Sequence, residues 1–115
     1  MLWYCWRNIK KNTLLRFYGV LNVIVENYKK GYKSILCAIK GYDSISNIDG
    51  IIGSYIDLFF CQKIVERNSH KFKFVDEEIN KKIDYIISLI NEEVILPKHA
   101  DNYALFVSFK HEGAC

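Results

Sequence analysis

The sequence lacks the cysteine and histidine spacings on which metal sites depend. Its four cysteines, Cys5, Cys37, Cys61 and Cys115, lie far apart, with no CxxC pair and no histidine at ligand spacing. We therefore expect no metal site. Cys37 and Cys61 fall on apolar faces of expected helices, where a reduced thiol acts as a small buried hydrophobe. This usage is typical of a reducing compartment.

A long apolar run and a secretory leader are also missing. No window approaches the roughly 18 uninterrupted apolar residues that a membrane-spanning helix needs, so we expect no integral membrane span. The N-terminus MLWYCWRNIKK begins apolar and then turns basic, which reverses the order of a secretory signal. Proline and glycine are scarce, at one and six residues, whereas isoleucine, lysine, asparagine and tyrosine are abundant, a bias that an AT-rich genome would also produce.

No motif of a catalytic site is present. None of the three histidines stands beside a cysteine or serine in a nucleophile motif, and the segment GIIG is too short and too apolar for a phosphate-binding loop. Two carboxylate pairs, Glu77 with Glu78 and Glu92 with Glu93, lie near the ends of an expected amphipathic helix, where solvated surface charge explains them. We expect a binding protein rather than an enzyme, and no cofactor.

Positive charge is modest and dispersed. The net charge is +3, and the lysines stand near expected helix ends rather than in one stripe: Lys10, Lys11, Lys29, Lys30 and Lys33. We expect no nucleic-acid partner, because such a partner calls for a concentrated basic surface. A small helical DNA-binding protein stays as a third hypothesis, which steep salt dependence of binding would reveal.

Helical periodicity begins in residues 13–30. Apolar residues recur there at three- and four-residue steps, which predicts a helix with one buried face. Asn12 or Thr13 can cap its start, and Gly31 is the expected stop. The run VLNVIV leaves a strand as the rival interpretation. The residues of the expected buried face are Leu14, Phe17, Tyr18, Leu21, Ile24, Val25 and Tyr28.

The central feature is the stretch of residues 48–61, IDGIIGSYIDLFFC, in which only Asp49, Ser54 and Asp57 are polar. A helix that is apolar around most of its circumference must be covered by other protein, so this helix is expected at the centre of the fold. It follows a short helix over residues 32–39 and a polar loop, starts near Ser46, and runs to about residue 67 or 68. Gly50 and Gly53 near its start remove side chains where a partner could approach the backbone.

A further long helix is expected from Asp76 to Val94, followed by a helix end or kink at Pro97 and a short helix that Asp101 can cap. The tally is five to seven helices and no strand. We therefore predict one all-α domain over residues 1–115, a bundle around the hydrophobic central helix.

Taken together, several stretches resemble motifs of the Bcl-2 family. Residues 47–55 stand where these proteins carry an asparagine-tryptophan-glycine-arginine motif that opens the buried central helix. Residues 101–107 stand where the family carries a second motif, which centres on a tryptophan followed by a phenylalanine-valine segment. The expected helix of residues 76–94 lies between these two motifs and matches the family's penultimate long helix. Upstream, residues 28–32 resemble the aromatic-basic segment that follows the third motif, and residues 15–20 resemble that motif itself.

Several positions depart from the family pattern. Ile51 stands where the motif arginine pairs with a ligand aspartate, Asp49 replaces a tryptophan, Tyr103 replaces another, and Val20 replaces an aspartate. The chain ends about eight residues after Val107, and we expect no transmembrane anchor. Such divergence resembles a viral homologue from a large DNA virus, such as an iridovirus or a poxvirus.

The resemblance implies a Bcl-2-like bundle with a hydrophobic groove that receives the BH-3 helix of pro-apoptotic host proteins. The function that follows is a viral inhibitor of host apoptosis in the host cell cytoplasm, brought to mitochondria by its partners. Since Ile51 replaces the arginine, we expect a narrow ligand range unless Lys29 or Lys33 reaches the ligand aspartate. Simple core packing stays open as an alternative for the groove walls. The expected groove residues are Ile24, Tyr28, Tyr32, Ile35, Gly50, Ile51, Ser54 and Leu58.

Two further expectations concern surfaces. The alternative function is a Bcl-2-fold adaptor that has closed or lost the groove and binds host innate immune signalling proteins through an outer surface. The other expectation is self-association, because a homodimer would cover the exposed apolar groove and so keep it from water.

Overall fold

The computed structural model describes residues 2–93 and 103–108, with side chains from residue 10 onward. These residues form four long helices and one short one, and the described ranges contain no strand. The long helices are α1 (Leu2–Ile24), α2 (Tyr28–Ser44), α3 (Ile48–Arg67) and α4 (Glu77–Asn91), and the short helix spans residues 103–108. The all-α prediction is confirmed.

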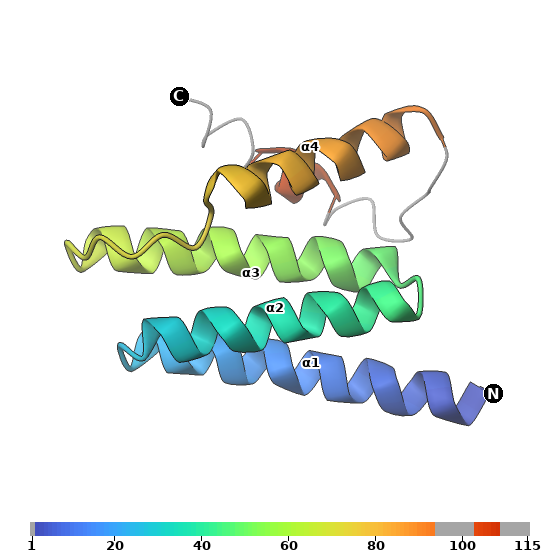
Figure 1. The fold of residues 1–115 in the computed structure, drawn as a ribbon, viewed down its shortest axis with the longest axis horizontal. Coiled ribbons are helices and arrows are strands. Elements are labelled where there is room, and N and C mark those ends of the chain that lie inside the picture. Colours follow the sequence, from blue (N-terminus) through green and yellow to red (C-terminus); the bar gives the residue numbers. More distant parts are fainter. Residues whose placement is uncertain (1, 94–102, 109–115) are drawn as a thin grey trace.

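The helices are stacked with α3 in the middle. Figure 1 shows α1, α2 and α3 side by side, with α4 and the short helix on the other side of α3. More than half of α3 is buried, including Ile52, Leu58 and Cys61. The prediction that the stretch IDGIIGSYIDLFFC forms a central buried helix is therefore confirmed.

The predicted start of α3, near Ser46, is close to the observed start at Ile48. The predicted start of α4 at Asp76 agrees with the structure, in which Asp76 is the N-cap. The side chain of Asn47, rather than Ser46, caps α3, because its Oδ1 accepts a hydrogen bond from the Gly50 amide at 3.0 Å. Asp76 Oδ1 likewise accepts from the Ile79 amide at 2.9 Å at the start of α4. A short helix near the C-terminus is also present. α4 ends at Asn91, three residues before the expected end at Val94. The expected roles of Pro97 and Asp101 lie outside the described residues.

The first two helix boundaries were predicted wrongly. α1 extends back to Leu2, so Asn12 and Thr13 lie inside it, and it ends at Ile24 rather than Lys30. The expected short helix over residues 32–39 is the middle of the longer α2, which continues to Ser44 through the first half of the expected polar loop. The expected stop, Gly31, lies inside α2 against α1.

All four long helices end through a residue that is not glycine in the left-handed backbone region. The amide after that residue bonds the carbonyl five residues back at the end of α1, α2 and α3, as in the Asn27–Asn22 pair at 2.7 Å. The sequence therefore has no glycine that marks the end of any of these four helices. The four left-handed residues are Glu26, Ser46, Ser69 and Glu93.

Gly31 has a packing role instead. A Cβ atom at its position would lie 2.5 Å from the Gly19 carbonyl oxygen and 2.6 Å from Val23 Cγ2. The two glycines thus let α1 and α2 approach each other closely. Asn12, Gly19, Asn22 and Val23 are buried on this inner side of α1.

The predicted buried face of α1 is wrong, except for Tyr28, which belongs to α2. Small and polar residues make the close contact with α2, so the large apolar residues point away from the protein. Their exposed fractions are 68% for Leu14, 64% for Phe17, 47% for Tyr18, 61% for Leu21, 56% for Ile24 and 64% for Val25.

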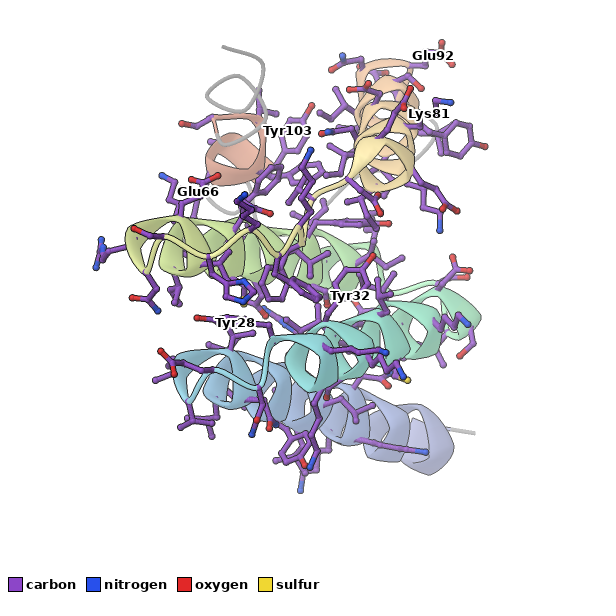
Figure 2. All side chains as sticks on the ribbon, turned by 60° about the vertical axis from the view of Figure 1, so that its left-hand side comes forward. Tyr28, Tyr32, Glu66, Lys81, Glu92 and Tyr103 are labelled. Atoms are coloured by element: carbon purple, nitrogen blue, oxygen red, sulfur yellow. The ribbon has the colours of Figure 1, made fainter. Side chains whose placement is uncertain are left out.

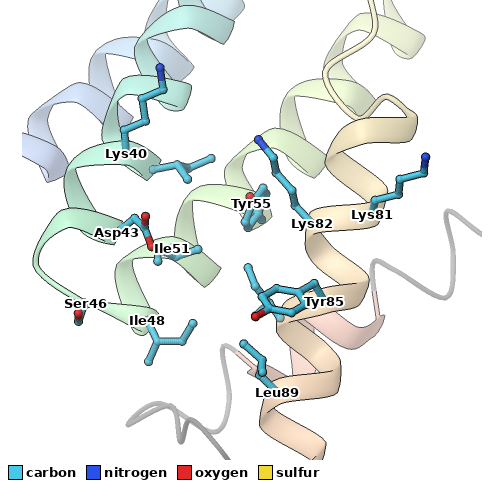
Figure 3. Close-up of a pocket in the computed structure, with 12 residues that line it drawn as sticks. Lys40, Asp43, Ser46, Ile48, Ile51, Tyr55, Lys81, Lys82, Tyr85 and Leu89 are labelled. Carbon is cyan, nitrogen blue, oxygen red and sulfur yellow. The ribbon is translucent and has the colours of Figure 1, made fainter.

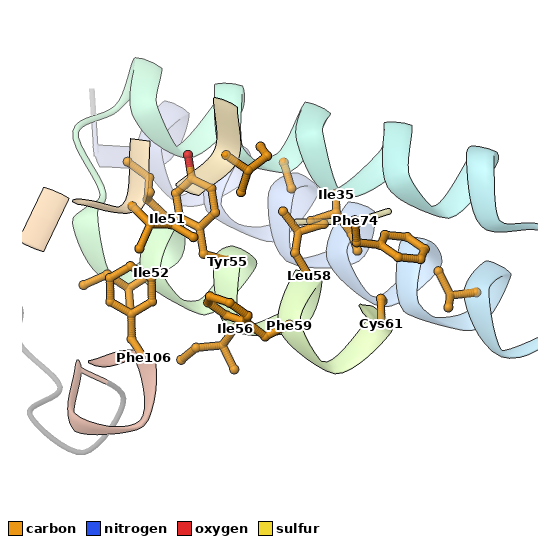
Figure 4. Close-up of a cluster of buried hydrophobic side chains, with 14 of the residues drawn as sticks. Ile35, Ile51, Ile52, Tyr55, Ile56, Leu58, Phe59, Cys61, Phe74 and Phe106 are labelled. Carbon is orange, nitrogen blue, oxygen red and sulfur yellow. The ribbon is translucent and has the colours of Figure 1, made fainter. Parts of the chain in front are cut away.

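The hydrophobic core lies on both sides of α3 (Figure 4). On one side the ring of Tyr55 stacks on Phe106 of the short helix, with centroids 6.3 Å apart. On the other, Leu58 and Ile35 are fully buried, and Phe74 from the segment before α4 is buried with them. The core thus joins α3 to every other part of the described fold except the outer side of α1.

Candidate functional site

The expected groove beside Tyr28 and Tyr32 is filled by the protein itself. The segment of residues 70–75 packs over both rings: Tyr28 is 7% exposed and lies 4.6 Å from the His70 ring, and Tyr32 lies 5.9 Å from both Phe72 and Phe74, measured between centroids. Figure 2 shows both tyrosines in the interior, close to α3. The side chains of His70, Phe72 and Phe74 therefore occupy the space beside these two tyrosines.

Three other expected groove residues are buried, and a fourth lies on the outside. Ile35 and Leu58 are fully buried, and the buried Ser54 hydroxyl donates to the Gly50 carbonyl oxygen at 2.8 Å. Ile24 is exposed at the end of α1. For Ile35 and Leu58, core packing is what the structure shows.

The two glycines of α3 make room for side chains of the protein rather than for a ligand. A Cβ atom at Gly50 would lie 2.2 Å from Tyr42 Cδ1, and one at Gly53 would lie 2.7 Å from Arg16 Nη2. Arg16 Nε donates to Asp57 Oδ2 at 2.8 Å and links α1 to α3. Burial raises the pKa of the Asp57 carboxyl, and Arg16 offsets part of that rise. The expectation that Gly50 forms the groove floor is corrected.

An open groove does exist, and Ile51 is the one expected groove residue that lines it. Its volume is about 590 Å³, and it lies between the α2–α3 corner and the facing side of α4 (Figure 3). α2 and the corner contribute Ile39, Lys40, Asp43 and Ser46; α3 contributes Ile48, Ile51 and Tyr55; α4 contributes Lys81, Lys82, Tyr85, Ile86 and Leu89.

The groove has an apolar floor and a basic rim. Ile51 and Tyr55 are nearly buried at 8% and 3% exposure and form the floor, whereas Tyr85 on α4 is 64% exposed. The rim carries three lysines and one carboxylate: Lys40, Lys81, Lys82 and Asp43. An apolar ligand with negative charge at its edge suits this arrangement.

Tyr55 supplies a polar group at the floor. Burial, with a smaller contribution from Asp43, raises the pKa of its phenol to about 12. The hydroxyl therefore stays protonated at neutral pH and can donate a hydrogen bond to a ligand.

Local sequence explains the shape of the groove. Ser46, in the left-handed region, turns the chain between α2 and α3, and the Asn47 cap starts α3 directly afterwards. On α4, Ile79, Ile83 and Ile90 are buried. Tyr85 and Leu89 stand one turn apart on the neighbouring strip of the same helix and face the groove.

Sequence reasoning missed the α4 side of the groove. The sequence predicts this helix from an apolar stripe, and Tyr85 and Leu89 stand beside that stripe without an assigned role. The stripe consists of Ile79, Ile83, Ile86, Ile87, Ile90 and Val94. Two large apolar residues four positions apart, next to a stripe that already suffices for packing, were the available signal. Lys29 and Lys33, the two lysines considered as substitutes for the family arginine, are not among the residues that line this groove.

Comparisons with protein-family models, with curated proteins and with solved structures find nothing that matches this chain. Within the described residues, no helix is long and apolar enough to cross a bilayer. The same part of the chain holds no group of three or more His, Cys, Asp or Glu side chains that could bind a metal ion. The function is therefore argued from the groove and from the residues that carry the family resemblance.

Proposed function

We propose that this protein binds an amphipathic helix of a partner in the groove between the α2–α3 corner and α4. The observation that carries the proposal is the open apolar surface of Ile48, Ile51 and Tyr55, which faces Tyr85 and Leu89 and is framed by lysines. Amphipathic helices bind in such grooves through apolar anchors at three- and four-residue spacing. The function is thus that of a helix receptor rather than of an enzyme.

The family resemblance supplies the kind of helix. On this proposal the protein is a Bcl-2-like, viral inhibitor of host apoptosis, and its ligand is the BH-3 helix of pro-apoptotic host proteins. The ligand aspartate, which the family arginine would bind, finds Ile51 here, so a lysine of the rim takes that role. Lys40 and Lys82 stand on opposite sides of the opening.

A lysine is a weaker substitute for the arginine. A planar guanidinium binds a carboxylate with two parallel hydrogen bonds, whereas an exposed ammonium acts as a mobile point charge. A charge-assisted hydrogen bond contributes about 1.5–3 kcal/mol, or roughly 10- to 100-fold in affinity. Affinity therefore depends mainly on apolar burial, and the ligand range is narrow.

Calorimetric titration with a panel of BH-3 peptides tests the proposal. We expect one or a few peptides to bind, and Tyr85→Glu to abolish that binding because it places a charge in the apolar wall. Leu21→Glu is the matched control, since Leu21 and Tyr85 are similarly exposed, at 61% and 64%, on different helices. If no peptide binds, or if Tyr85→Glu binds as wild type does, the groove assignment fails.

The adaptor hypothesis ranks second. It requires a closed groove and an apolar patch elsewhere, and Tyr42 does fill the space beside Gly50. The cavity beside Ile51 nevertheless stays open, which favours helix binding.

A further inference from the structure

The outer side of α1 carries a continuous apolar stripe. Large residues recur there at three- and four-residue steps, and each is between 47% and 68% exposed: Leu14, Phe17, Tyr18, Leu21, Ile24 and Val25. The stripe extends for about 17 Å along the helix. Figure 1 shows α1 at the edge of the fold, with α2 and α3 on its other side. A stripe of this size on a surface helix marks an interaction site.

Positive charge stands at one end of this stripe and along one side of it. Lys10 and Lys11 are exposed about one turn before Leu14, and Lys29 and Lys30 are exposed at the start of α2, which turns back along α1. Lys30 Nζ lies 5.5 Å from the centroid of the Tyr18 ring, so this ammonium lies directly beside the stripe.

Negative charge is nearly absent from the same region. α1 contains no acidic residue, and Glu26 is the one acid between residues 10 and 30. The remaining cation of this part of α1, Arg16, points inward to Asp57. The exposed side of α1 therefore combines apolar and basic character.

This distribution of charge disfavours a second copy of the chain as the occupant. In an antiparallel pair centred on the stripe, residues 10–30 of one copy would offer a single acid, Glu26, to the four exposed lysines of the same segment of the other. In a parallel pair, each lysine would approach its own counterpart. Both arrangements bring like charges together at the rim of the contact, which is unfavourable.

An anionic bilayer surface satisfies both parts of the pattern. Apolar and aromatic side chains enter the boundary between headgroups and acyl chains, while lysines extend to the phosphates and carboxylates of the headgroups. We propose that the outer face of α1 binds the surface of anionic lipid membranes, with the helix lying in the plane of the interface. The residues of this lipid-binding face do not line the peptide groove.

The proposal also predicts how the protein would be oriented. α1 and α4 lie on opposite sides of α3 (Figure 1). A protein bound through α1 thus keeps the groove directed away from the lipid.

Flotation with vesicles of phosphatidylcholine, with and without phosphatidylserine, tests the proposal. We expect binding only where phosphatidylserine is present, and weaker binding at higher salt. Each of Lys10 and Lys30 replaced by glutamine should weaken binding about fivefold. Leu21→Glu should weaken it by at least about tenfold, because the leucine no longer enters the apolar layer.

Tyr85→Glu is the matched control for the vesicle experiment. It introduces the same charge at a similarly exposed position on α4 and should float as wild type does, while losing peptide binding. Failure of the lipid proposal is thus separable from failure of the groove proposal. Circular dichroism of each variant checks that the helices are intact.

Three results would overturn the lipid proposal. One is equal binding to neutral and anionic vesicles, and another is unchanged binding of Leu21→Glu. The third is absence of binding to the anionic vesicles; a concentration-dependent dimer that Leu21→Glu dissociates would then show that a second copy covers the stripe.

Discussion

Replacing Gly50 by alanine distinguishes packing from ligand binding at the start of α3. If Gly50 faced a ligand, the extra methyl group would leave folding nearly unchanged and weaken ligand binding. The structure predicts the opposite. The new Cβ atom would lie 2.2 Å from Tyr42 Cδ1 and 2.4 Å from Cε1, and the Tyr42 ring is 2% exposed.

The size of the effect follows from two opposing contributions. Ordinary contact between carbon atoms needs more than about 3.4 Å, so the buried ring must move by more than an ångström. Overpacking of this kind costs about 1–3 kcal/mol. The Tyr42 hydroxyl lies 2.9 Å from Thr13 Oγ1, and this hydrogen bond resists the movement. Alanine regains about 1 kcal/mol of helix propensity, so the net loss of stability is at most about 2 kcal/mol.

Urea unfolding followed by far-UV circular dichroism measures this loss. The decisive comparison repeats Gly50→Ala in a Tyr42→Ala background, where the ring atoms that meet the new methyl group are gone. There the same substitution should stabilise the protein by up to about 1 kcal/mol. If Gly50→Ala has the same effect with and without the Tyr42 ring, the packing argument is refuted.

Two further predictions concern buried groups. Burial raises the pKa of the Cys61 thiol to about 12, whereas Cys37 is exposed. A maleimide should therefore modify Cys37 in the native protein and Cys61 only after unfolding. Replacing Cys5 and Cys115 by serine leaves these two thiols as the only ones that can react. Gln62 Oε1 accepts a hydrogen bond from the Phe74 amide at 2.7 Å. Gln62→Leu should therefore lower the free energy of unfolding in urea by about 1–3 kcal/mol and accelerate hydrogen exchange at the Phe74 amide. Gln62→Glu keeps an acceptor and should stay closer to wild type.

Strong local signals made the second half of the fold predictable. α3 is apolar around most of its circumference, which permits only a central position, and the observed helix ends within one residue of the prediction. Asp76 combines a capping side chain with acidic residues in the following turn, and α4 starts there as predicted. Such signals are contained in a few neighbouring residues, so tertiary contacts do not override them.

The first half was less predictable because its glycines, Gly19, Gly31 and Gly41, stand inside helices and not at their ends. Glu26 and Ser46 adopt the left-handed conformation, which costs about 1–2 kcal/mol for residues other than glycine, and backbone hydrogen bonds at each helix end stabilise it. Gly31, by contrast, lies within a regular helix. The same ambiguity affected α1, where periodicity identified one apolar face correctly but could not indicate whether the protein or something else covers it.

The glycines of α3 show why the groove was expected in the wrong place. A glycine in a helix indicates that something approaches the backbone, but only the tertiary structure shows what approaches. Here Tyr42 approaches Gly50 and Arg16 approaches Gly53, so both glycines join α3 to the two preceding helices. The open groove lies instead beside Ile51, between the α2–α3 corner and α4. It thus lies where α4 leaves apolar residues uncovered, and not where glycine removes a side chain.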